Sequence, residues 1–256
     1  MQSDDLLRPD WCVDAGVGAL MSTRRGGVSL APHDSLNLGG AAGDDAHALA
    51  ENRRRFASEL GAPVRYLRQV HGATVLRLTA GDEGDLPPAD AAITTEAGVA
   101  CTVLAADCLP VLLAAPQARG VGAAHAGWRG LAAGVLEATV QALCEAAHCA
   151  PGDLKAWLGP CIGPRRFEVG ADVLDAFGAA AAARFVPRAR ADGSPRWLAD
   201  LPGLARDRLH GAGVRDVSGG AWCTVEDASR FFSFRRDGVT GRMAAAVWIR
   251  GRGEGG

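Results

Sequence analysis

The feature that most constrains the fold is the stretch LAADCLPVLLAAPQARGVGAAHAGWRG, residues 104–130, where an apolar run contains Asp107, Cys108 and His125. Its apolar segments are short and are bounded by Asp, Pro or Gly, which is typical of buried strands. An ionised carboxylate is costly to remove from water unless another group pairs with it. We therefore expect buried strands whose ends bring polar side chains together.

The composition predicts one large globular domain. The chain has 256 residues, 48% of them hydrophobic and 22% charged, which is enough to build a single core. A formal net charge of -2 gives no electrostatic footprint for nucleic acid or an anionic membrane surface. We expect one domain over residues 1–256 with a disordered tail at 251–256, forming a monomer or a small homo-oligomer.

The amino terminus and the cysteines favour a cytoplasmic protein. The first residues, MQSDDLLRPDWCVDAG, lack the basic and then apolar regions of a secretory signal. No apolar run reaches the roughly 18 residues that a membrane span requires. The seven cysteines are an odd number and form no dense pattern, so we expect reduced thiols.

Short strands and helices alternate along the chain without a repeat. Strands are expected within residues 17–29, 64–72, 90–95, 98–107, 109–116, 120–125 and 154–159. Helices are expected within 44–62, 128–147, 171–185 and 201–213, of which 128–147 is the longest. The chain closes with a pair of segments, RFFSFRRDG and GRMAAAVWIR, at 230–238 and 241–250.

Three residues at the ends of expected strands form a candidate metal site. His71, Cys108 and His125 are far apart in the sequence, as ligands of catalytic metal centres often are. Two imidazoles and one thiolate suit Zn²⁺ and leave a fourth tetrahedral position for water or substrate. Core packing is the alternative for each residue taken alone, because free Cys is often buried. Asp107 is a candidate to orient a ligating imidazole, to accept a proton, or simply to cap a turn.

The segment HAGWRG predicts a strand that ends at His125 and a helix that begins near Trp128. Backbone N–H groups at a helix start favour an anion such as phosphate. Arg129 either pairs with that anion or points into solvent. Gly127 and Gly130 are equally consistent with a tight turn and with close packing.

Eight segments in this order resemble the YfiH family: STRRGGVS, SLNLGG, ENRRRFASELG, RQVHGATV, ADCLPVLL, AAHAGWRGLAAGVLEATV, LGPCIGPRRFEVG and FFSFRRDGVTGRMAA. Members of that family are described as laccase-domain or polyphenol oxidase proteins and as purine nucleoside phosphorylases. The similarity runs from about residue 20 to 250. It implies a single α+β domain with mixed β-sheets and flanking helices, grouped with cysteine-hydrolase-like folds.

The resemblance also implies a function. It assigns a Zn²⁺ site to His71, Cys108 and His125, where Cu²⁺ would also fit, since it binds such ligands more tightly. The implied substrates are purine nucleosides and phosphate. Adenosine, inosine and S-methyl-5′-thioadenosine would be cleaved by phosphorolysis, and adenosine would also be deaminated.

Further site residues follow from the same resemblance and from the chemistry of the implied reactions. It places Arg24 and Asn37 in the pocket. We expect Arg24, Arg129 and the helix start at Trp128 to hold phosphate, and Asp107 to shuttle protons beside Cys108 during deamination.

One departure from the family is visible. Many relatives carry cysteines and an aromatic residue after GPCIGP, whereas this chain has Arg165, Arg166 and Phe167 there. Any role for thiols at these positions is therefore absent. Cys161 remains, and we expect it to be a buried structural thiol.

Three alternatives remain open. A copper-dependent polyphenol oxidase of the multicopper kind needs many His ligands, and the chain has six His in all. A cysteine-type amide hydrolase that edits peptidoglycan precursors would use Cys108 as a nucleophile activated by a His. A zinc-stabilised scaffold without turnover is the third, but an open three-ligand site is unusual for a purely structural role.

Overall fold

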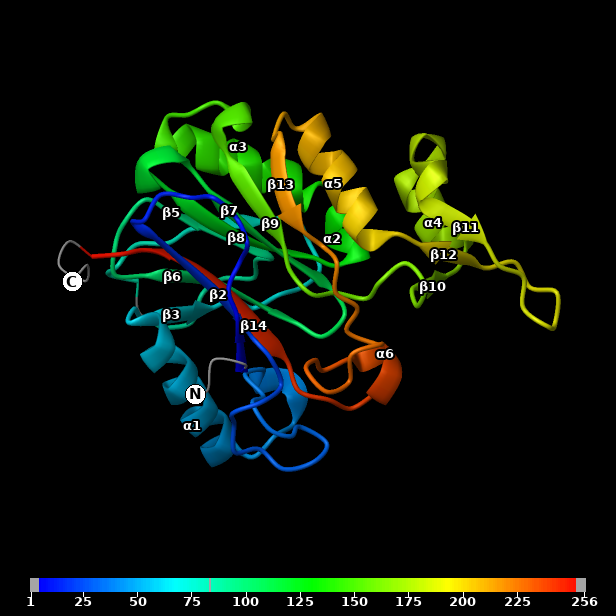
Figure 1. Ribbon diagram of the computed structural model, residues 1–256, viewed down its shortest axis with the longest axis horizontal. Helices are drawn as coiled ribbons and strands as arrows, with labels where there is room; N and C mark the ends of the chain where they lie inside the picture. The colour runs from blue at the N-terminus through cyan, green and yellow to red at the C-terminus, as the bar shows by residue number, and fades with distance from the viewer. Residues whose placement is uncertain (1–4, 83, 252–256) are drawn as a thin grey trace.

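Two mixed β-sheets lie face to face in the computed structural model, which describes residues 5–82 and 84–251 (Figure 1). The five-stranded sheet has the order β1 (Leu6–Leu7), β2 (Val17–Ser22), β14 (Met243–Ile249), β6 (Ala100–Ala105) and β3 (Val64–Tyr66). The six-stranded sheet has the order β13 (Asp216–Gly219), β9 (Lys155–Leu158), β7 (Leu109–Ala114), β8 (Val121–Ala126), β5 (Ala91–Thr94) and β4 (Val75–Arg77). Antiparallel pairs predominate, with parallel pairing at β3–β6, β4–β5 and β9–β13. The α+β fold with mixed sheets that the resemblance implied is confirmed.

The central strands β7, β8 and β14 are almost entirely apolar and buried because both faces of each sheet are covered. In β14, Ala245 and Val247 belong to the core between the sheets, whereas Ala246 and Trp248 face α1 (Ala46–Leu60). This is the alternation that a strand imposes on successive side chains. Gly18 on β2 makes room for the Trp248 indole, because a Cβ there would lie 2.2 Å from it.

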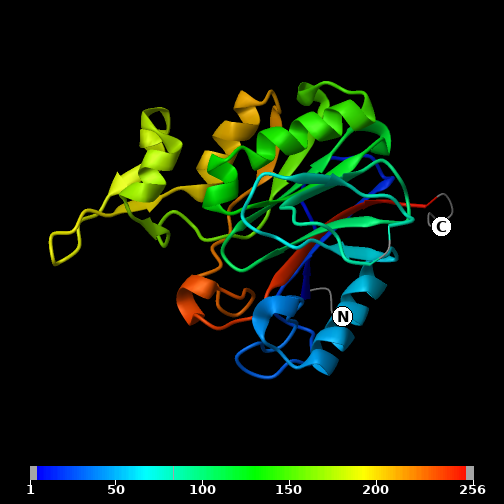
Figure 2. The same ribbon diagram turned by 180° about the vertical axis from the view of Figure 1, so that it is seen from behind.

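Helices form the two outer layers. α3 (Val135–Ala147) and α5 (Leu201–Gly211) cover the six-stranded sheet, where Val111 and Leu113 of β7 share one buried cluster with Val140 and Leu143 of α3. Figures 1 and 2 show these helices on one side of the sheets and α1 on the other. The result is a four-layer arrangement of helix, sheet, sheet and helix.

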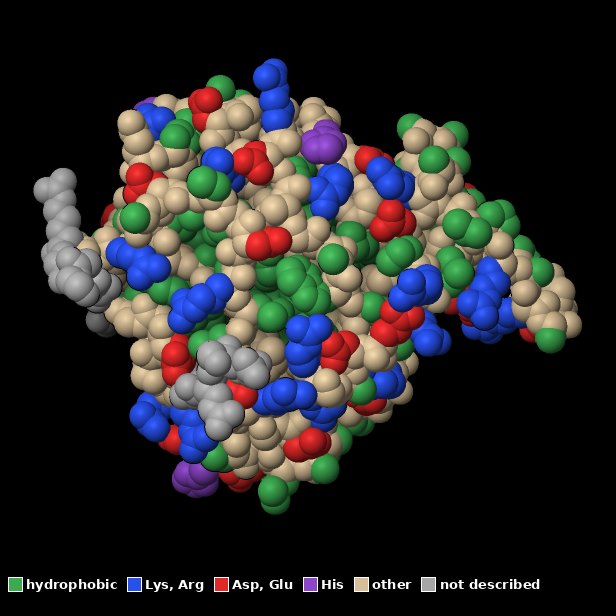
Figure 3. All heavy atoms as spheres, viewed as in Figure 1, with side chains coloured by type: hydrophobic (Ala, Val, Ile, Leu, Met, Phe, Trp, Pro, Cys, Tyr) green, Lys and Arg blue, Asp and Glu red, His purple; other side chains and the backbone are tan. Residues whose placement is uncertain are grey.

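Shorter elements complete the fold. The remaining helices are α2 (Trp128–Ala132), α4 (Ala171–Phe177) and α6 (Phe234–Asp237), with 3₁₀ turns η2 (Gly40–Ala42), η3 (Pro116–Ala118), η4 (Pro151–Asp153) and η5 (Ala179–Arg184). A small sheet of β10 (Glu168–Val169), β12 (Trp197–Ala199) and β11 (Phe185–Pro187) projects with α4 at the right of Figure 1. None of the helices described is long and apolar enough to cross a membrane. Acidic and basic side chains are mixed over the face in Figure 3.

Two expected helices are broken at glycines. The helix expected at 128–147 is divided into α2 and α3, because Gly134 takes a left-handed conformation with φ +92°. Likewise, the helix expected at 171–185 ends at Gly178, whose φ is +74°, and continues only as η5. Consequently α1, with 15 residues, is the longest helix described.

One further expectation was wrong in part. The strand expected over 64–72 ends at Tyr66, and the following residues form a loop. Of the closing pair, only the second segment contains a strand, while RFFSFRRDG contains α6. Ser233 begins that helix, since its side chain accepts a hydrogen bond from the Arg236 N–H. The tail expected at 251–256 lies outside the described residues beyond Gly251.

Candidate metal centre

His71, Cys108 and His125 converge at one point, as the sequence predicted. Their ligand atoms all lie within 4.8 Å of one another, and Cys108 Sγ is 3.8 Å from His71 Nε2. The β7–β8 ladder explains part of this closeness, because Pro110 pairs with His125 and Cys108 lies just before β7. His71 comes from the loop after β3 and has a left-handed backbone, φ +61°. Three distant segments thus supply one compact donor set.

Asp90, directly before β5, holds two of these segments in place. Its side chain is fully buried, and Oδ1 accepts a hydrogen bond of 2.8 Å from His125 Nδ1. The same carboxylate accepts the N–H groups of Val70, His71 and Gly72 at 3.0, 2.9 and 2.7 Å. Because a carboxylate only accepts, Nδ1 of His125 carries a proton towards Asp90, and Nε2 is the nitrogen that can bind a metal once it has released its own proton.

The sequence interpretation missed Asp90. The signal was present, since DAAITT begins a buried strand with an acid just as the Asp107 stretch does. Burial raises the pKa of Asp90, but the hydrogen bonds from His125 and from the backbone N–H groups outweigh this effect and lower the pKa overall. Asp90 is therefore an ionised anchor for the imidazole.

The electrostatics of the centre favour a thiolate. Burial raises the pKa of Cys108, but the charges and hydrogen bonds of His125 and His71 outweigh it and lower the pKa to about 6. Burial lowers the pKa of His125, and the Cys108 thiolate and Asp90 raise it to about 9. A deprotonated sulfur beside two imidazoles is the form in which these residues bind a metal.

These residues fit a zinc ion. Zn²⁺ takes Cys and His donors in tetrahedral geometry, and a carboxylate behind a ligating His is its usual support. The same donor set also fits copper. Among the described residues, His71, Cys108 and His125 form the one group of three or more His, Cys, Asp or Glu side chains that could hold a metal ion.

Asp107 lies beside the donor set but bonds elsewhere. Its Oδ1 accepts from Thr224 Oγ1 at 2.6 Å, and its Oδ2 accepts from the Arg235 N–H at 2.6 Å. Its own carbonyl accepts from the N–H of Ile162. The hydrogen bond to an imidazole thus comes from Asp90, whereas Asp107 fastens other loops to the turn that carries Cys108.

The centre opens into a cavity of about 1080 Å³. Trp128 and Arg129 line it, with the Arg129 guanidinium 4.3 Å from the Trp128 ring centroid. The other basic and aromatic residues of the lining are Arg53, Arg68, Arg235, Arg242, Tyr66, Phe167 and Phe234. Only Asp85 and Asp107 in the lining described are acidic, so the cavity suits an anionic ligand with an aromatic part.

Gly127 and Gly130 allow close packing at the centre. A Cβ on Gly127 would lie 2.9 Å from Cys108 Sγ and 2.9 Å from His71 Cδ2. A Cβ on Gly130 would lie 2.7 Å from the carbonyl oxygen of Gly72. Of the two interpretations left open by the sequence, close packing accounts for both glycines.

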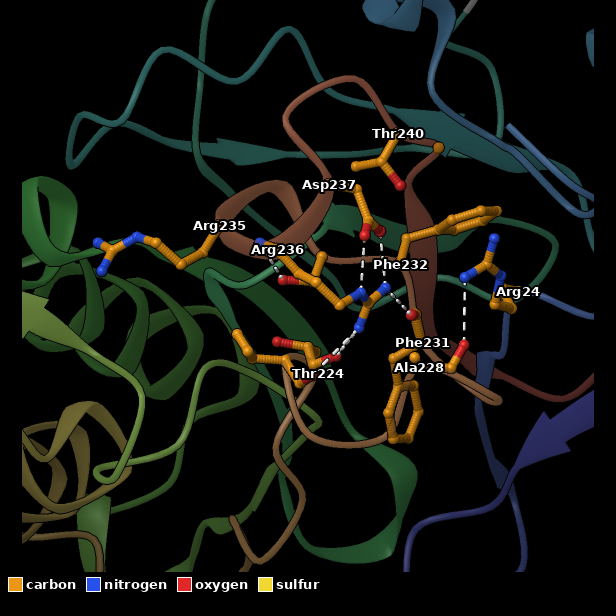
Figure 4. Close-up of polar contacts among 12 residues, drawn as sticks. Arg24, Thr224, Ala228, Phe231, Phe232, Arg235, Arg236, Asp237 and Thr240 are labelled. Carbon is orange, nitrogen blue, oxygen red and sulfur yellow. Dashed lines mark hydrogen bonds and ion pairs between the residues drawn. The ribbon is translucent and has the colours of Figure 1, made fainter. Parts of the chain in front are cut away.

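Arg24 lies outside the lining of this cavity. Its Nε donates to the carbonyl of Asp34 and its Nη1 to that of Ala228, as Figure 4 shows for the second bond. It borders a separate depression of about 390 Å³ with Asp34, Ala228 and Ser229. The structure does not bring Arg24 to the three metal ligands.

Asn37 is fully buried and reaches the cavity only through a neighbour. Its amide donates to the Gly39 carbonyl and to Asp44, and its oxygen accepts the N–H groups of Gly39 and Arg242. All of these partners are protein atoms. Of them, Gly39 and Arg242 line the cavity.

Cys161 is fully buried, as expected of a structural thiol. Burial raises its pKa, and nearby Cys223 and Asp107 raise it further. Its backbone carbonyl accepts from the N–H of Thr224, which in turn bonds to Asp107. Cys161 therefore supports the loop beneath the centre.

A family model described as multi-copper polyphenol oxidoreductase laccase matches residues 18–250. The chain belongs to this laccase-like family, which includes the YfiH proteins. A purine nucleoside phosphorylase of Pseudomonas aeruginosa is 51% identical over 248 residues, covering 95% of this chain and 98% of the relative. The purine nucleoside phosphorylase YfiH of Escherichia coli is 47% identical over 249 residues, with the same coverage of 95% and 98%. The crystal structure of Neisseria meningitidis protein NMB0706 superposes with a TM-score of 0.90 at 45% identity, covering 96% of this chain and 100% of that one.

Proposed function

We propose that this laccase-like family member is a zinc-dependent purine nucleoside phosphorylase that acts on adenosine, inosine and S-methyl-5′-thioadenosine, and that it also deaminates adenosine. The observation that carries the proposal is the joining of His71, Cys108 and His125 at the floor of an arginine-lined cavity. Two relatives that are 51% and 47% identical to this chain are named purine nucleoside phosphorylases. We also propose that the chain is one domain over residues 1–256.

The metal would be held by His71 Nε2, Cys108 Sγ and His125 Nε2. A zinc ion bound there supplies a Lewis acid with one coordination position left for substrate or water. Asp90 keeps the His125 ring in the tautomer that this requires.

Arg242 supports the assignment of a phosphate substrate. Its side chain lines the cavity, and the hydrogen bonds of its Nη1 go to the neutral carbonyls of Thr240 and Gly241. Burial lowers its pKa, and the charges of Cys108 and Asp107 act against this. A guanidinium partly removed from water is stabilised by a bound anion, and phosphate oxygens match its geometry.

Phosphorolysis then needs little covalent chemistry from the protein. A phosphate oxygen forms a bond to C1′ of the ribose while the bond from C1′ to the purine breaks, and the purine leaves with the electron pair and takes up a proton. Arg129 and Arg242 would hold the phosphate beside the sugar, which lowers the barrier by positioning and by charge. The helix start at Trp128 remains a proposed phosphate contact, whereas the Arg24 guanidinium bonds to Asp34 and Ala228 outside the cavity lining, so the phosphate role implied for Arg24 is not part of this proposal.

Deamination of adenosine replaces the amino group at C6 with oxygen from water and releases ammonia. Asp107 is the proposed proton shuttle, because it lies beside Cys108 and lines the cavity. Its two oxygens already accept from Thr224 and Arg235, so the shuttle would use the lone pairs that remain.

A cysteine-type amide hydrolase is the second candidate, and one observation favours it. The Cys108 sulfur lies 3.8 Å from His71, and its pKa is lowered to about 6, as in activated nucleophiles. The second imidazole on the same sulfur fits a metal site better than a nucleophile with one base. Alkylation of the metal-loaded protein distinguishes the two, because a zinc thiolate is protected whereas a free nucleophile is inactivated.

A copper-dependent polyphenol oxidase is the third candidate, favoured by the description of the family model. Reduction of dioxygen in multicopper enzymes uses several copper ions, and the described residues provide one cluster of three ligands. A single copper in this cluster would give weak oxidation at most.

The test is an analysis of products. Metal-quantified protein is incubated with adenosine, inosine or methylthioadenosine, with and without phosphate, and the products are separated by chromatography. The proposal predicts free base and the sugar 1-phosphate only when phosphate is present, and inosine from adenosine in either case. No turnover of any nucleoside by zinc-loaded protein would transfer the assignment to the amide hydrolase.

A further inference from the structure

The three phenylalanines of the segment FFSF, residues 231–234, differ in their exposure to solvent. Phe231 and Phe232 are fully buried in the core between the sheets. Phe234 is 59% exposed and lines the cavity that contains the metal ligands. A flat group lying on this exposed ring inside the cavity would gain the burial that the two neighbouring phenylalanines already have.

The backbone on either side of Phe234 is fixed. The Ser233 hydroxyl accepts the N–H of Arg236, and the N–H of Arg235 donates to Asp107. The Arg236 guanidinium donates to the carbonyls of Thr224 and Phe231 and forms a two-pronged ion pair with Asp237, as Figure 4 shows. Phe234 therefore stands on a rigid support rather than on a loose surface loop.

The same bonds connect Phe234 to the metal centre. Arg235 follows Phe234 in the chain, Cys108 follows Asp107, and the 2.6 Å bond between Arg235 N–H and the Asp107 carboxylate joins the two turns. A flat group lying on the Phe234 ring would thus be held at a set distance from the ligands. The Arg242 guanidinium is 5.9 Å from the centroid of this ring.

We propose that Phe234 is the stacking platform for the purine base of the substrate. This inference rests on the proposed function and names the residue that selects a flat heteroaromatic group. The neighbouring Arg242 then holds the phosphate, which agrees with the chemistry because base and phosphate exchange places on one carbon, C1′. Stacking on an aromatic ring accepts any purine, which agrees with the range of nucleosides proposed.

The test compares Phe234→Leu, which keeps the apolar volume but removes the flat ring, with Phe234→Tyr, which keeps the ring. Equilibrium binding of hypoxanthine and adenine is measured on the zinc-loaded protein, together with KM and kcat for inosine. We expect Phe234→Leu to weaken base binding and raise KM about tenfold or more, with a smaller change in kcat. Phe234→Tyr should restore both, and the loss of purine absorbance on stacking should be seen in wild type and Phe234→Tyr but not in Phe234→Leu.

The matched control is Val239→Ala. Val239 is 60% exposed in the loop after α6 but does not belong to the cavity lining, so this variant should bind and react like wild type. Inorganic phosphate binding and zinc content should be the same in all four proteins. Unchanged base affinity in Phe234→Leu would overturn the inference, even if nucleosides are cleaved.

Failure of the proposed function gives a different result. If the wild type binds hypoxanthine in a Phe234-dependent manner but cleaves no nucleoside, the platform stands and the phosphorylase assignment falls. If the wild type neither binds a free base nor cleaves a nucleoside, both are overturned.

Discussion

Two polar clusters of this protein can be compared: a buried one around Asn37, and one beside the cavity in which His125 is buried, Cys108 is partly exposed and His71 is exposed. In the first, the side chains of Asn37 and Asn52 bond to backbone groups of residues 28–39 and to Ser29 and Asp44. In the second, the Asp90 carboxylate is also bonded to backbone groups. The three metal-donor atoms of His71, Cys108 and His125, however, have mainly one another as near polar neighbours.

The difference separates a structural network from a functional one. The polar atoms of Asn37 are used by the protein itself, and their bonds hold the loop before α1 in place. The nitrogen and sulfur lone pairs of the second cluster face a common point beside a cavity. Burial of polar groups alone therefore does not identify a site, whereas donor atoms that converge beside a cavity and are left for a ligand do.

Removal of a central donor should have the largest effect. Cys108→Ala is expected to lose bound zinc and to reduce kcat/KM at least a thousandfold, because two imidazoles alone hold the ion weakly. Metal analysis and nucleoside turnover measure both quantities. Cys144→Ala, at a cysteine outside the centre, is the control and should keep both. A Cys108→Ala protein with full zinc content would refute the ligand assignment.

Asn37→Ala should destabilise the fold without disturbing the metal. Four hydrogen bonds are lost and the N–H groups of Gly39 and Arg242 lose their partner, so we expect a cost of about 3 kcal/mol in the free energy of unfolding. Urea unfolding measures the cost, and zinc per folded chain should stay at the wild-type value. Unchanged stability with a raised KM would instead support the pocket role that the resemblance implied.

Asp90→Asn should weaken zinc binding about ten- to a hundredfold while leaving the three ligands in place. The amide cannot accept as strongly from His125 and from three N–H groups at once. Competition with a chromophoric chelator gives the dissociation constant. Asp107→Asn is the matched comparison, since its bonds go to Thr224 and Arg235, and its zinc affinity should stay within about threefold. Equal losses in both variants would contradict the division of roles.

Arg24→Gln should have the smallest effect. Arg24 bonds to Asp34 and Ala228 and lies outside the cavity lining, so a loss of about 1 kcal/mol in stability is expected, with KM for phosphate within about twofold of wild type. Steady-state kinetics at varied phosphate concentration provides the check. A tenfold rise in KM would show that Arg24 contacts phosphate after all.

The sequence predicted the parts of this molecule that rest on local patterns. The apolar runs that form β5 to β8 were recognisable, and so were Cys108 before β7 and His125 near the end of β8, whereas His71 was expected at the end of a strand and lies in the loop after β3. The helix expected within 44–62 is also confirmed, and Asp45 and Gly61 cap it.

The parts that were missed depend on contacts between distant segments. Asp90 gains its role only when β5 lies beside β8 and the loop of His71. The segment RFFSFRRDG looked regular along the chain, but the bonds from Arg236 and Asp107 hold it as a short helix. Arg24 and Asn37 were identified with the pocket through the resemblance, and their hydrogen-bond partners could not be read from their own neighbours in the sequence.

The central claim is that the three-residue centre carries the metal on which nucleoside cleavage depends. The most direct measurement is a titration of metal-free protein with zinc, following phosphate-dependent release of hypoxanthine from inosine at each occupancy. Activity should rise in proportion to zinc bound and level off at one ion per chain. Full activity in the metal-free protein, or zinc binding at one ion per chain without any base release, would contradict the account.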